Sequence, residues 1–335
     1  MQFNEIWKHL EADVGHKGAS GILKRRVMPE SPCDIFLAVE KPQNTRLMLV
    51  RVSAVALTDA GTFPRSKGCD VRAVRLPDDE PDKATVQLIL TGHQFREIFT
   101  VLVQDIASSI AECSSAERCT GALIERLQSW QHFLDEYGPE GLGEEAQRGL
   151  YGELWFLRRY VLPALNPAAA VNSWTGHRRS PQDFELRHCA VEVKTTSGRQ
   201  HQKLRIANER QLDDSNISPI FIFHISLDAR LNSGETLVDL VEDIRSLIST
   251  SQSGQQAFEV ALRNGGYLDY HSPQYVKTGY SIRQSNVFRV REGFPRIVES
   301  DLPNGVGDVQ YSISVAECMH FSISEVEMTA FIARA

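Results

Sequence analysis

The stretch that most constrains the fold runs from residue 183 to residue 194, DFELRHCAVEVK, in which apolar and charged residues alternate. Successive side chains of a β-strand point to opposite faces, so this pattern predicts two amphipathic strands joined by a short turn. For a two-residue turn, the expected pairs are Phe184 with Val191, Leu186 with Cys189, and Asp183 with Glu192. The Arg-His turn lacks the Gly or Asn that favours such a connection, so a longer turn with shifted pairing stays open.

The charged face of this hairpin has the composition of a metal site. It carries Asp183, Glu185, Glu192 and Lys194. Mg²⁺ prefers one or two carboxylates, retains several waters and takes further ligands from substrate phosphate. A bound metal activates water, and a nearby ammonium orients that water or stabilises developing negative charge. The pattern therefore indicates phosphodiester chemistry. The alternative is that Glu and Lys only support pairing between the strands.

A second acidic candidate, Glu153, lies in a predicted helix over residues 150–160. Leucines recur there at spacings of four and three residues (150, 154 and 157), and Glu153 belongs to the same face or its edge. An ionised carboxylate on a buried face is costly unless it is paired or binds a cation. Glu153 is therefore a candidate ligand or outer-shell residue. The alternatives are a rim glutamate that reaches water and an ion pair with Arg158 or Lys194.

Three short motifs bring these residues together: Gly152-Glu153-Leu154, Ser180-Pro181-Gln182-Asp183-Phe184 and Val191-Glu192-Val193-Lys194. They resemble the PD-(D/E)xK nuclease superfamily, and most closely a bacterial group of PD-(D/E)xK motif proteins often encoded in anti-phage defence clusters. The resemblance implies a restriction-endonuclease-like core in an α+β or α/β chain. It also implies that Asp183, Glu192 and Glu153 hold Mg²⁺, with Mn²⁺ able to substitute, and that Lys194 completes the catalytic set.

The chain departs from the superfamily pattern in two places. Pro181 stands two residues before Asp183 instead of next to it. Gln211 has Ser215, not tyrosine, four positions later, so the exonuclease-type Q-x-x-x-Y motif is absent.

Charge is unevenly distributed. The net charge of −7 argues against a chain coated for nucleic acid. Between residues 176 and 210, however, eight Lys and Arg residues face four acidic ones, which favours a local substrate groove. The expected substrate contacts are Arg178, Arg179, Thr195, Arg199, His201 and Lys203. Trp174, just before them, either stacks on a base or closes the core.

Composition and cysteine spacing narrow the class of protein. Hydrophobic content of 42% and charged content of 24% are ordinary for a soluble globular protein. The six cysteines lack C-x-x-C spacing, which favours reduced thiols over a zinc site. The sequence shows no basic-then-apolar leader and no apolar run of membrane length, so we expect a cytoplasmic protein without membrane association.

Residue patterning predicts four segments along the chain. They are an N-terminal β-rich domain (1–92), a helical connector (93–137), the nuclease core (138–230) and a C-terminal α/β extension (231–335). Within the core, residues 219–225 are expected to form a central strand with His224 as a satisfied core histidine, and residues 208–212 to begin a helix.

The sequence therefore predicts a Mg²⁺-dependent deoxyribonuclease, which the resemblance places in bacterial anti-phage defence or restriction. Because no NTPase motif is present, any energy-driven step would need another protein, and the resemblance suggests ATPase or helicase subunits of a defence system as partners. A homodimer would allow both DNA strands to be cut. One alternative is a catalytically inactive nuclease-fold subunit that binds DNA or scaffolds a defence complex. Another is a nuclease acting on RNA or on single strands.

Overall fold

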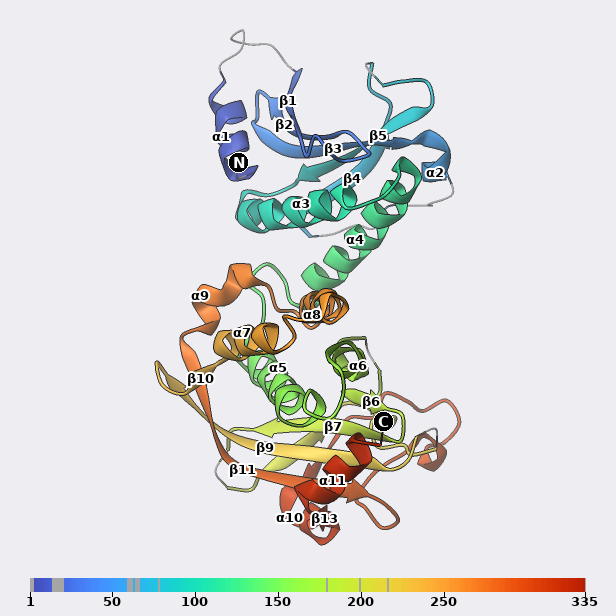
Figure 1. Cartoon of the computed structure of the whole chain (residues 1–335), viewed down its shortest axis with the longest axis vertical. Helices are drawn as coiled ribbons and strands as arrows, with labels where there is room; N and C mark the ends of the chain where they lie inside the picture. Colours follow the sequence, from blue (N-terminus) through green and yellow to red (C-terminus); the bar gives the residue numbers. More distant parts are fainter. Residues whose placement is uncertain are drawn as a thin grey trace. The chain divides into compact units, whose positions relative to one another are not determined.

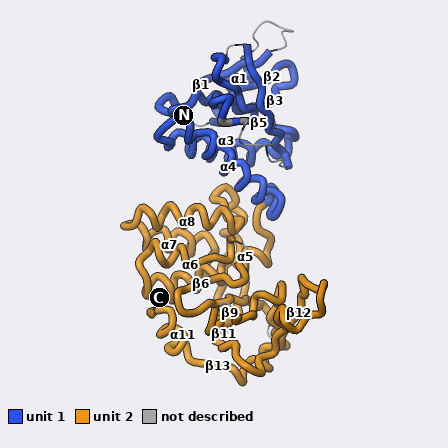
Figure 2. Tube along the Cα trace, turned by 90° about the vertical axis from the view of Figure 1, so that its right-hand side faces the viewer, with its two compact units in different colours: residues 1–140 blue, residues 141–335 orange. Residues whose placement is uncertain are grey.

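The computed structural model describes residues 3–13, 21–58, 63, 67–77, 79–178, 180–198, 200–215 and 217–334. The chain forms two compact units, Met1–Glu140 and Gly141–Ala335 (Figure 2). The finer division into four segments stays a prediction. Within the described residues, no helix is both long and apolar enough to cross a membrane.

Unit 1 contains an antiparallel sheet with strand order β1-β2-β3-β5-β4 and helices packed on it (Figure 1). Its strands are β1 Gly21–Val27, β2 Ile35–Lys41, β3 Thr45–Ser53, β4 Cys69–Val74 and β5 Lys83–Leu90. Its helices are α1 Phe3–Ala12, α2 Ala54–Thr58, α3 Arg96–Ala111 and α4 Ala116–Glu136, with a 3₁₀ turn, η1, at His93–Phe95. The β-rich start and the helical pattern after it are confirmed.

Helix α1 is fixed to this sheet by one buried aromatic residue. Trp7 is fully buried, and its indole Nε1 donates to the carbonyl oxygen of Ala38 on β2 at 3.2 Å. Its ring also packs on Phe99 of α3, with the centroids 5.8 Å apart. The apolar stripes of α3 and α4, spaced by three and four residues, are buried as amphipathic periodicity requires.

Unit 2 is built on a mixed sheet with strand order β10-β11-β9-β7-β6, in which β13 also pairs with β11. Its strands are β6 Phe184–Leu186, β7 Cys189–Thr196, β8 Lys203–Ile206, β9 Ile220–Leu231, β10 Glu235–Thr236, β11 Thr278–Val290, β12 Tyr311–Ser314 and β13 Ser322–Ile323. Strands β7 and β9 are parallel, whereas β8 and β12 form a separate antiparallel pair.

The helices of unit 2 include α5 to α8, which Figure 1 shows on one side of the sheet. The helices are α5 Glu144–Phe156, α6 Pro167–Ser173, α7 Leu237–Leu247, α8 Gln252–Asn264, α9 Ser272–Tyr275, α10 Val315–Cys318 and α11 Glu325–Ile332. Shorter turns are η2 Leu157–Val161 (a π-helical continuation of α5), η3 Gly176–Arg178, η4 Asp269–His271, η5 Glu299–Asp301 and η6 Met319–Phe321.

The predicted hairpin register is confirmed. Phe184 pairs with Val191 and Leu186 with Cys189, so the turn between β6 and β7 has two residues despite its unfavourable sequence. Tertiary packing explains why the Arg-His turn is tolerated, because the apolar face of the hairpin is buried under α5. Phe156 of that helix lies 5.0 Å, centroid to centroid, from both Phe184 and Phe223.

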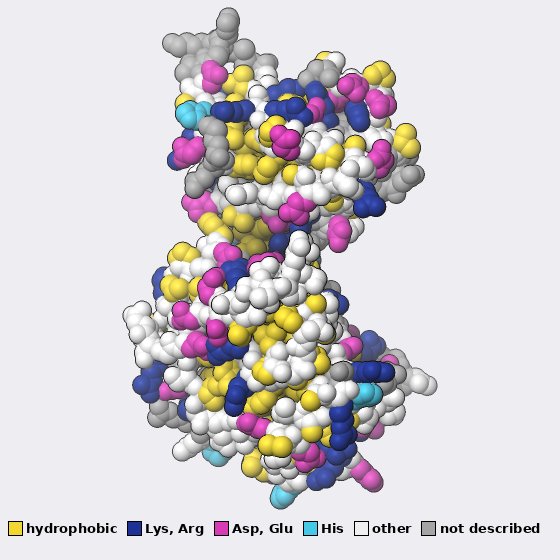
Figure 3. Space-filling model, viewed as in Figure 1, with side chains coloured by type: hydrophobic (Ala, Val, Ile, Leu, Met, Phe, Trp, Pro, Cys, Tyr) yellow, Lys and Arg dark blue, Asp and Glu magenta, His cyan; other side chains and the backbone are white. Residues whose placement is uncertain are grey.

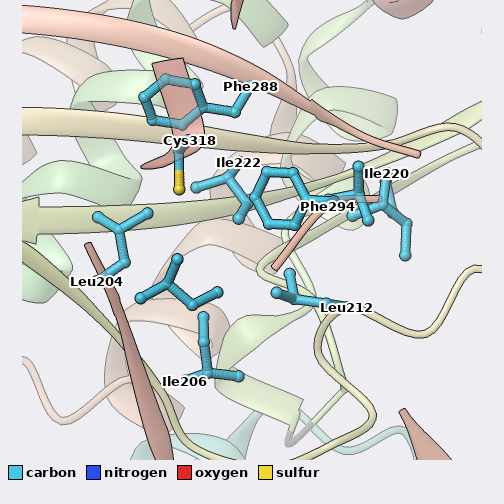
Figure 4. Close-up of a cluster of buried hydrophobic side chains, with 11 residues drawn as sticks. Leu204, Ile206, Leu212, Ile220, Ile222, Phe288, Phe294 and Cys318 are labelled. Atoms are coloured by element: carbon cyan, nitrogen blue, oxygen red, sulfur yellow. The ribbon is translucent and has the colours of Figure 1, made fainter. Parts of the chain in front are cut away.

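The opposite face of the sheet is covered by β8, β12 and the C-terminal part of the unit. Figure 4 shows side chains from these segments converging on β9 and β11. The buried members are Ala190, Leu204, Ile206, Leu212, Ile220, Ile222, Phe288, Val290, Phe294, Ile313 and Cys318. Glu192 and Lys194 belong to this face, because they alternate with Val191 and Val193 along β7.

Two expectations for the core are confirmed and one is wrong. Residues 219–225 lie at the start of the central strand β9, and His224 is fully buried with both ring nitrogens in contact with polar partners, Thr196 and Asn286. The predicted helix at residues 208–212 is a turn instead. Asn208 Oδ1 accepts from the backbone N–H of Arg210, a local bond that competes with a helix.

Candidate active site

Glycine at position 152 lets α5 lie directly on β7. A Cβ atom at Gly152 would come within 2.3 Å of Thr195 Cγ2, so only glycine permits this distance between helix and strand. The next residue, Glu153, interacts electrostatically with Glu192 and Lys194 of β7.

A second glycine reveals that two of the predicted acids converge. A Cβ at Gly176 would lie 2.7 Å from Asp183 Oδ1 and 3.2 Å from Glu153 Oε2, so both carboxylates border the same small space. These residues come from a helix, a turn and the start of a strand. The fold therefore brings together acids that are 30 positions apart in the sequence.

Asp183 is fixed on both its side chain and its backbone. Oδ2 accepts a 2.7 Å hydrogen bond from the backbone N–H of Val193 on the neighbouring strand. Its carbonyl oxygen accepts from the N–H groups of Thr175 and Gly176 at 2.7 and 3.1 Å. Because these bonds fix the side chain, Oδ1 is the oxygen directed toward Gly176.

Glu153 is oriented by Trp174, whose Nε1 donates to Glu153 Oε2 at 2.7 Å. Trp174 is fully buried, so the core-packing interpretation of this residue is confirmed and the base-stacking one is wrong. The alternative pairing of Glu153 with Arg158 is also wrong, since that arginine binds Glu235 and Asp243.

Glu192, Lys194 and Gln211 form a closed set of contacts. Glu192 Oε1 lies 2.7 Å from Lys194 Nζ and accepts from Gln211 Nε2 at 2.8 Å, while Lys194 Nζ donates to Gln211 Oε1 at 3.3 Å. The Gln211 amide cannot be flipped, because Oε1 also accepts from the backbone N–H of Ala207 at 2.8 Å. Glu192 Oε2, by contrast, is buried and has no hydrogen-bond partner among the described residues.

Burial raises the pKa of each of the three carboxyl groups. It raises the pKa of Glu153 to about 7 against the opposing hydrogen bond from Trp174, with Glu192 adding a smaller rise. Burial, then the negative charges of Glu192 and Glu153, hold the pKa of Asp183 well above its usual range. Burial raises the pKa of Glu192 against the opposing charge of Lys194.

Lys194 remains a cation in this setting. Burial alone would lower the pKa of its ammonium, but Glu192 and then Asp183 more than offset that effect, so the pKa is raised. One fixed positive charge therefore faces three crowded acids. Such a site favours either protons or an additional cation.

The donor set fits a hard divalent cation. Within the described ranges, no three His, Cys, Asp or Glu side chains are grouped closely enough to enclose a metal by themselves. Mg²⁺ and Mn²⁺ do not need such a cage, because one or two carboxylates suffice when waters and phosphate complete the shell. Glu192 Oε2 and Asp183 Oδ1 are oxygen donors of that kind, with Glu153 beside them.

The residues predicted to contact substrate lie in different environments. Arg178 is exposed in the turn that begins with Gly176, and its Nε donates to His177 Nε2. Thr195 packs its methyl group toward α5, not toward Glu192. His201 and Lys203 are exposed, the first in the loop before β8 and the second on it, and Arg179 and Arg199 lie outside the described residues.

Sequence reasoning missed Gln211 as a member of the site. The available signal was the glutamine of the Q-x-x-x-Y pattern, which was set aside because its tyrosine is lacking. The structure keeps the glutamine next to Glu192 and Lys194 without that tyrosine.

Comparison with known proteins agrees with this arrangement. A family model described as "Putative PD-(D/E)XK family member, (DUF4420)" matches residues 3–316. The chain belongs to this family. Its mixed α+β architecture is that of a restriction-endonuclease-like PD-(D/E)xK protein, as the motifs predicted. Comparisons with curated proteins and with solved structures gave no match.

Proposed function

We propose that this PD-(D/E)xK protein is a Mg²⁺-dependent deoxyribonuclease that hydrolyses phosphodiester bonds and accepts Mn²⁺ as a substitute. The observation that carries the proposal is the unequal use of the two Glu192 oxygens. Oε1 is held by Lys194 and Gln211, whereas Oε2 is buried without a partner in the described part of the chain. A buried carboxylate oxygen of this kind is costly unless a cation binds it.

Each residue then has a distinct part in the reaction. Asp183 and Glu192 hold the metal, and Glu153 is a further ligand or a partner of the metal's waters. When bound, the metal polarises the phosphoryl group and acidifies water. The Lys194 ammonium, fixed by Glu192 and Gln211, orients the attacking water or stabilises charge on the phosphoryl oxygens. By analogy with the superfamily, we propose a 5′-phosphate product.

DNA is the proposed substrate because of where the positive charge lies. The space-filling view in Figure 3 has Lys and Arg side chains gathered along one side of unit 2, at the lower right. Arg178 adds an exposed guanidinium in the turn beside Asp183. The net charge of −7 weakens unassisted DNA binding. Partner subunits such as an ATPase or a helicase, or a second copy of the chain, would strengthen that binding. The resemblance to defence proteins supports such partners and a role in anti-phage defence or restriction.

The test is cleavage of supercoiled plasmid, single-stranded DNA and RNA with Mg²⁺, with Mn²⁺ and with EDTA. Wild type is compared with Lys194→Ala, Asp183→Ala and the matched control Lys277→Ala, which removes an exposed lysine of the same unit. We expect metal-dependent cutting of DNA by wild type and the control, lost in the two site variants. Cutting that survives in both site variants would assign it to another protein or site.

The substrate comparison also separates the alternatives. Preferential cutting of RNA or of single strands would replace the deoxyribonuclease proposal with the corresponding nuclease. Metal-independent DNA binding without cleavage, with and without partner subunits, would favour the catalytically inactive nuclease-fold subunit.

A further inference from the structure

Gln211 lies in a segment with no regular structure to hold it. Residues 207–214, the first part of the connection from β8 to β9, contain turns but no helix or strand. The residue before Asp183 supplies one anchor, because Gln182 Nε2 donates to the carbonyl oxygens of Arg210 and Gln211 at 3.2 and 3.1 Å. The amide of Gln211 nevertheless has to be placed within hydrogen-bond distance of Glu192 and Lys194, so further anchors are required.

The C-terminal part of unit 2 supplies them. Arg296 Nη1 donates to the carbonyl oxygen of Leu212 at 2.6 Å, and its Nη2 lies 2.8 Å from Asp214 Oδ1. The planar guanidinium therefore fixes two points of the segment on the C-terminal side of Gln211. On the other side, Glu209 Oε2 accepts from the backbone N–H of Val309 at 2.9 Å.

Apolar packing reinforces these polar contacts. Leu212 is fully buried and belongs to the hydrophobic cluster of Figure 4, in which Phe294, two residues before Arg296, also lies. The Arg296 side chain is 19% exposed, so loss of the guanidinium would leave the Leu212 carbonyl without this donor and Asp214 without its cation. The segment would then lose its fixed position relative to β7.

We infer that Arg296 is a positioning residue of the catalytic centre, which acts through the 207–214 segment to hold the Gln211 amide against Glu192 and Lys194. The inference rests on the proposed nuclease function. Residues 294–309, which are far from the motifs in the sequence, would then help to fix the position of the catalytic side chains.

The test compares Arg296→Met and Arg296→Lys with Arg245→Met. Arg245 is a suitable control, since it is 24% exposed and also pairs with carboxylates (Glu242, Glu259 and Asp269), but it joins α7 and α8 to the chain after α8. For Arg296→Met we expect kcat to fall about 10- to 100-fold, as for other residues that orient ligands indirectly, with unchanged DNA Kd. Arg296→Lys should retain part of the activity, and added guanidinium ion should partly restore Arg296→Met.

A second readout does not depend on cleavage. The side-chain amide resonance of Gln211, assigned by its loss in Gln211→Leu, should shift in Arg296→Met and stay unchanged in Arg245→Met. If Arg296→Met fails to fold, Arg296→Lys and the milder Glu209→Gln serve the same comparison. A kcat and an amide resonance that match those of Arg245→Met would overturn the inference. If both Lys194→Ala and Asp183→Ala still cleave, the proposed function itself is wrong; if only the Arg296 result fails, the function stands.

Discussion

Removing the Lys194 charge tests whether the site is a buried, electrostatically coupled set. In Lys194→Met, Glu192 loses a cation 2.7 Å from Oε1 and remains 2% exposed. At an effective dielectric of about 20, a pair of unit charges at that distance attracts by roughly 6 kcal/mol. Desolvation of both ions offsets part of this. The expected loss in the free energy of unfolding is therefore about 3–5 kcal/mol, the cost of leaving one buried charge unpaired.

The loss should depend on pH with a defined sign. The folded pKa of Glu192 already lies above its ordinary value of 4.5, and removal of the ammonium raises it further. Below pH 4.5 the carboxyl is protonated in both the folded and the unfolded variant, so the penalty is small. It grows as the pH rises from 4.5 through the folded pKa, because folding then opposes ionisation.

The assay is urea unfolding in EDTA, followed by hydrogen exchange of peptides from β7 and β9 so that unit 2 is measured by itself. Lys277→Met is the control for loss of an exposed lysine. The double variant Lys194→Met/Glu192→Gln removes the unpaired charge but keeps an acceptor for Gln211, so it should recover most of the lost stability. A single variant as stable as the control, or a double variant no better than the single one, would refute the electrostatic argument.

Three further outcomes are expected. Gly176→Ala should reduce kcat, measured by cleavage, with little loss of folded protein, measured by circular dichroism. The added Cβ would lie only 2.7 Å from Asp183 Oδ1 and would therefore push that carboxylate out of place. The affinity for Mg²⁺, measured by calorimetry, should rise from about pH 6 to about pH 8, because Glu153, whose pKa is raised to about 7, must be ionised to bind a cation. His224 has a folded pKa of about 4 against 6.5 for the free residue, so the unfolded chain binds a proton first as the pH falls. The free energy of unfolding should therefore fall by about 2 kcal/mol between pH 6.5 and about pH 5 because of His224. This part of the pH dependence should disappear in His224→Gln when urea unfolding is compared at the two pH values.

Local patterns predicted the parts of the site whose geometry is set within one element. Alternation placed Glu192 and Lys194 on one face of β7, and the leucine spacing placed Glu153 on the inward face of α5. Both conclusions need only the periodicity of the strand or the helix. The hairpin register expected for a two-residue turn is the one observed, although the Arg-His turn left a shifted pairing open.

The rest of the site depends on contacts between distant segments, which periodicity does not encode. Gln211 contacts Glu192 from a segment whose carbonyl groups accept hydrogen bonds from Gln182 and Arg296. Strand β11 runs without a break from Thr278 to Val290, with a bulge between Ile282 and Gln284. Its continuity depends on pairing with almost the whole length of β9, a strand about 50 positions earlier in the sequence.

The E-x-K spacing explains why the two carboxylate oxygens of Glu192 have different surroundings. Residues two apart on a strand share a face, so the flexible Lys194 side chain can reach back to Oε1 of the same carboxylate. Gln211 occupies Oε1 as well, which concentrates the protein's own donors on one oxygen. The other oxygen, Oε2, is buried without a partner among the described residues, and it is there that the proposed metal would bind. Glu192 would then join the metal to the lysine, so a change that lets Lys194 or Gln211 move should disturb metal binding even though neither is a ligand.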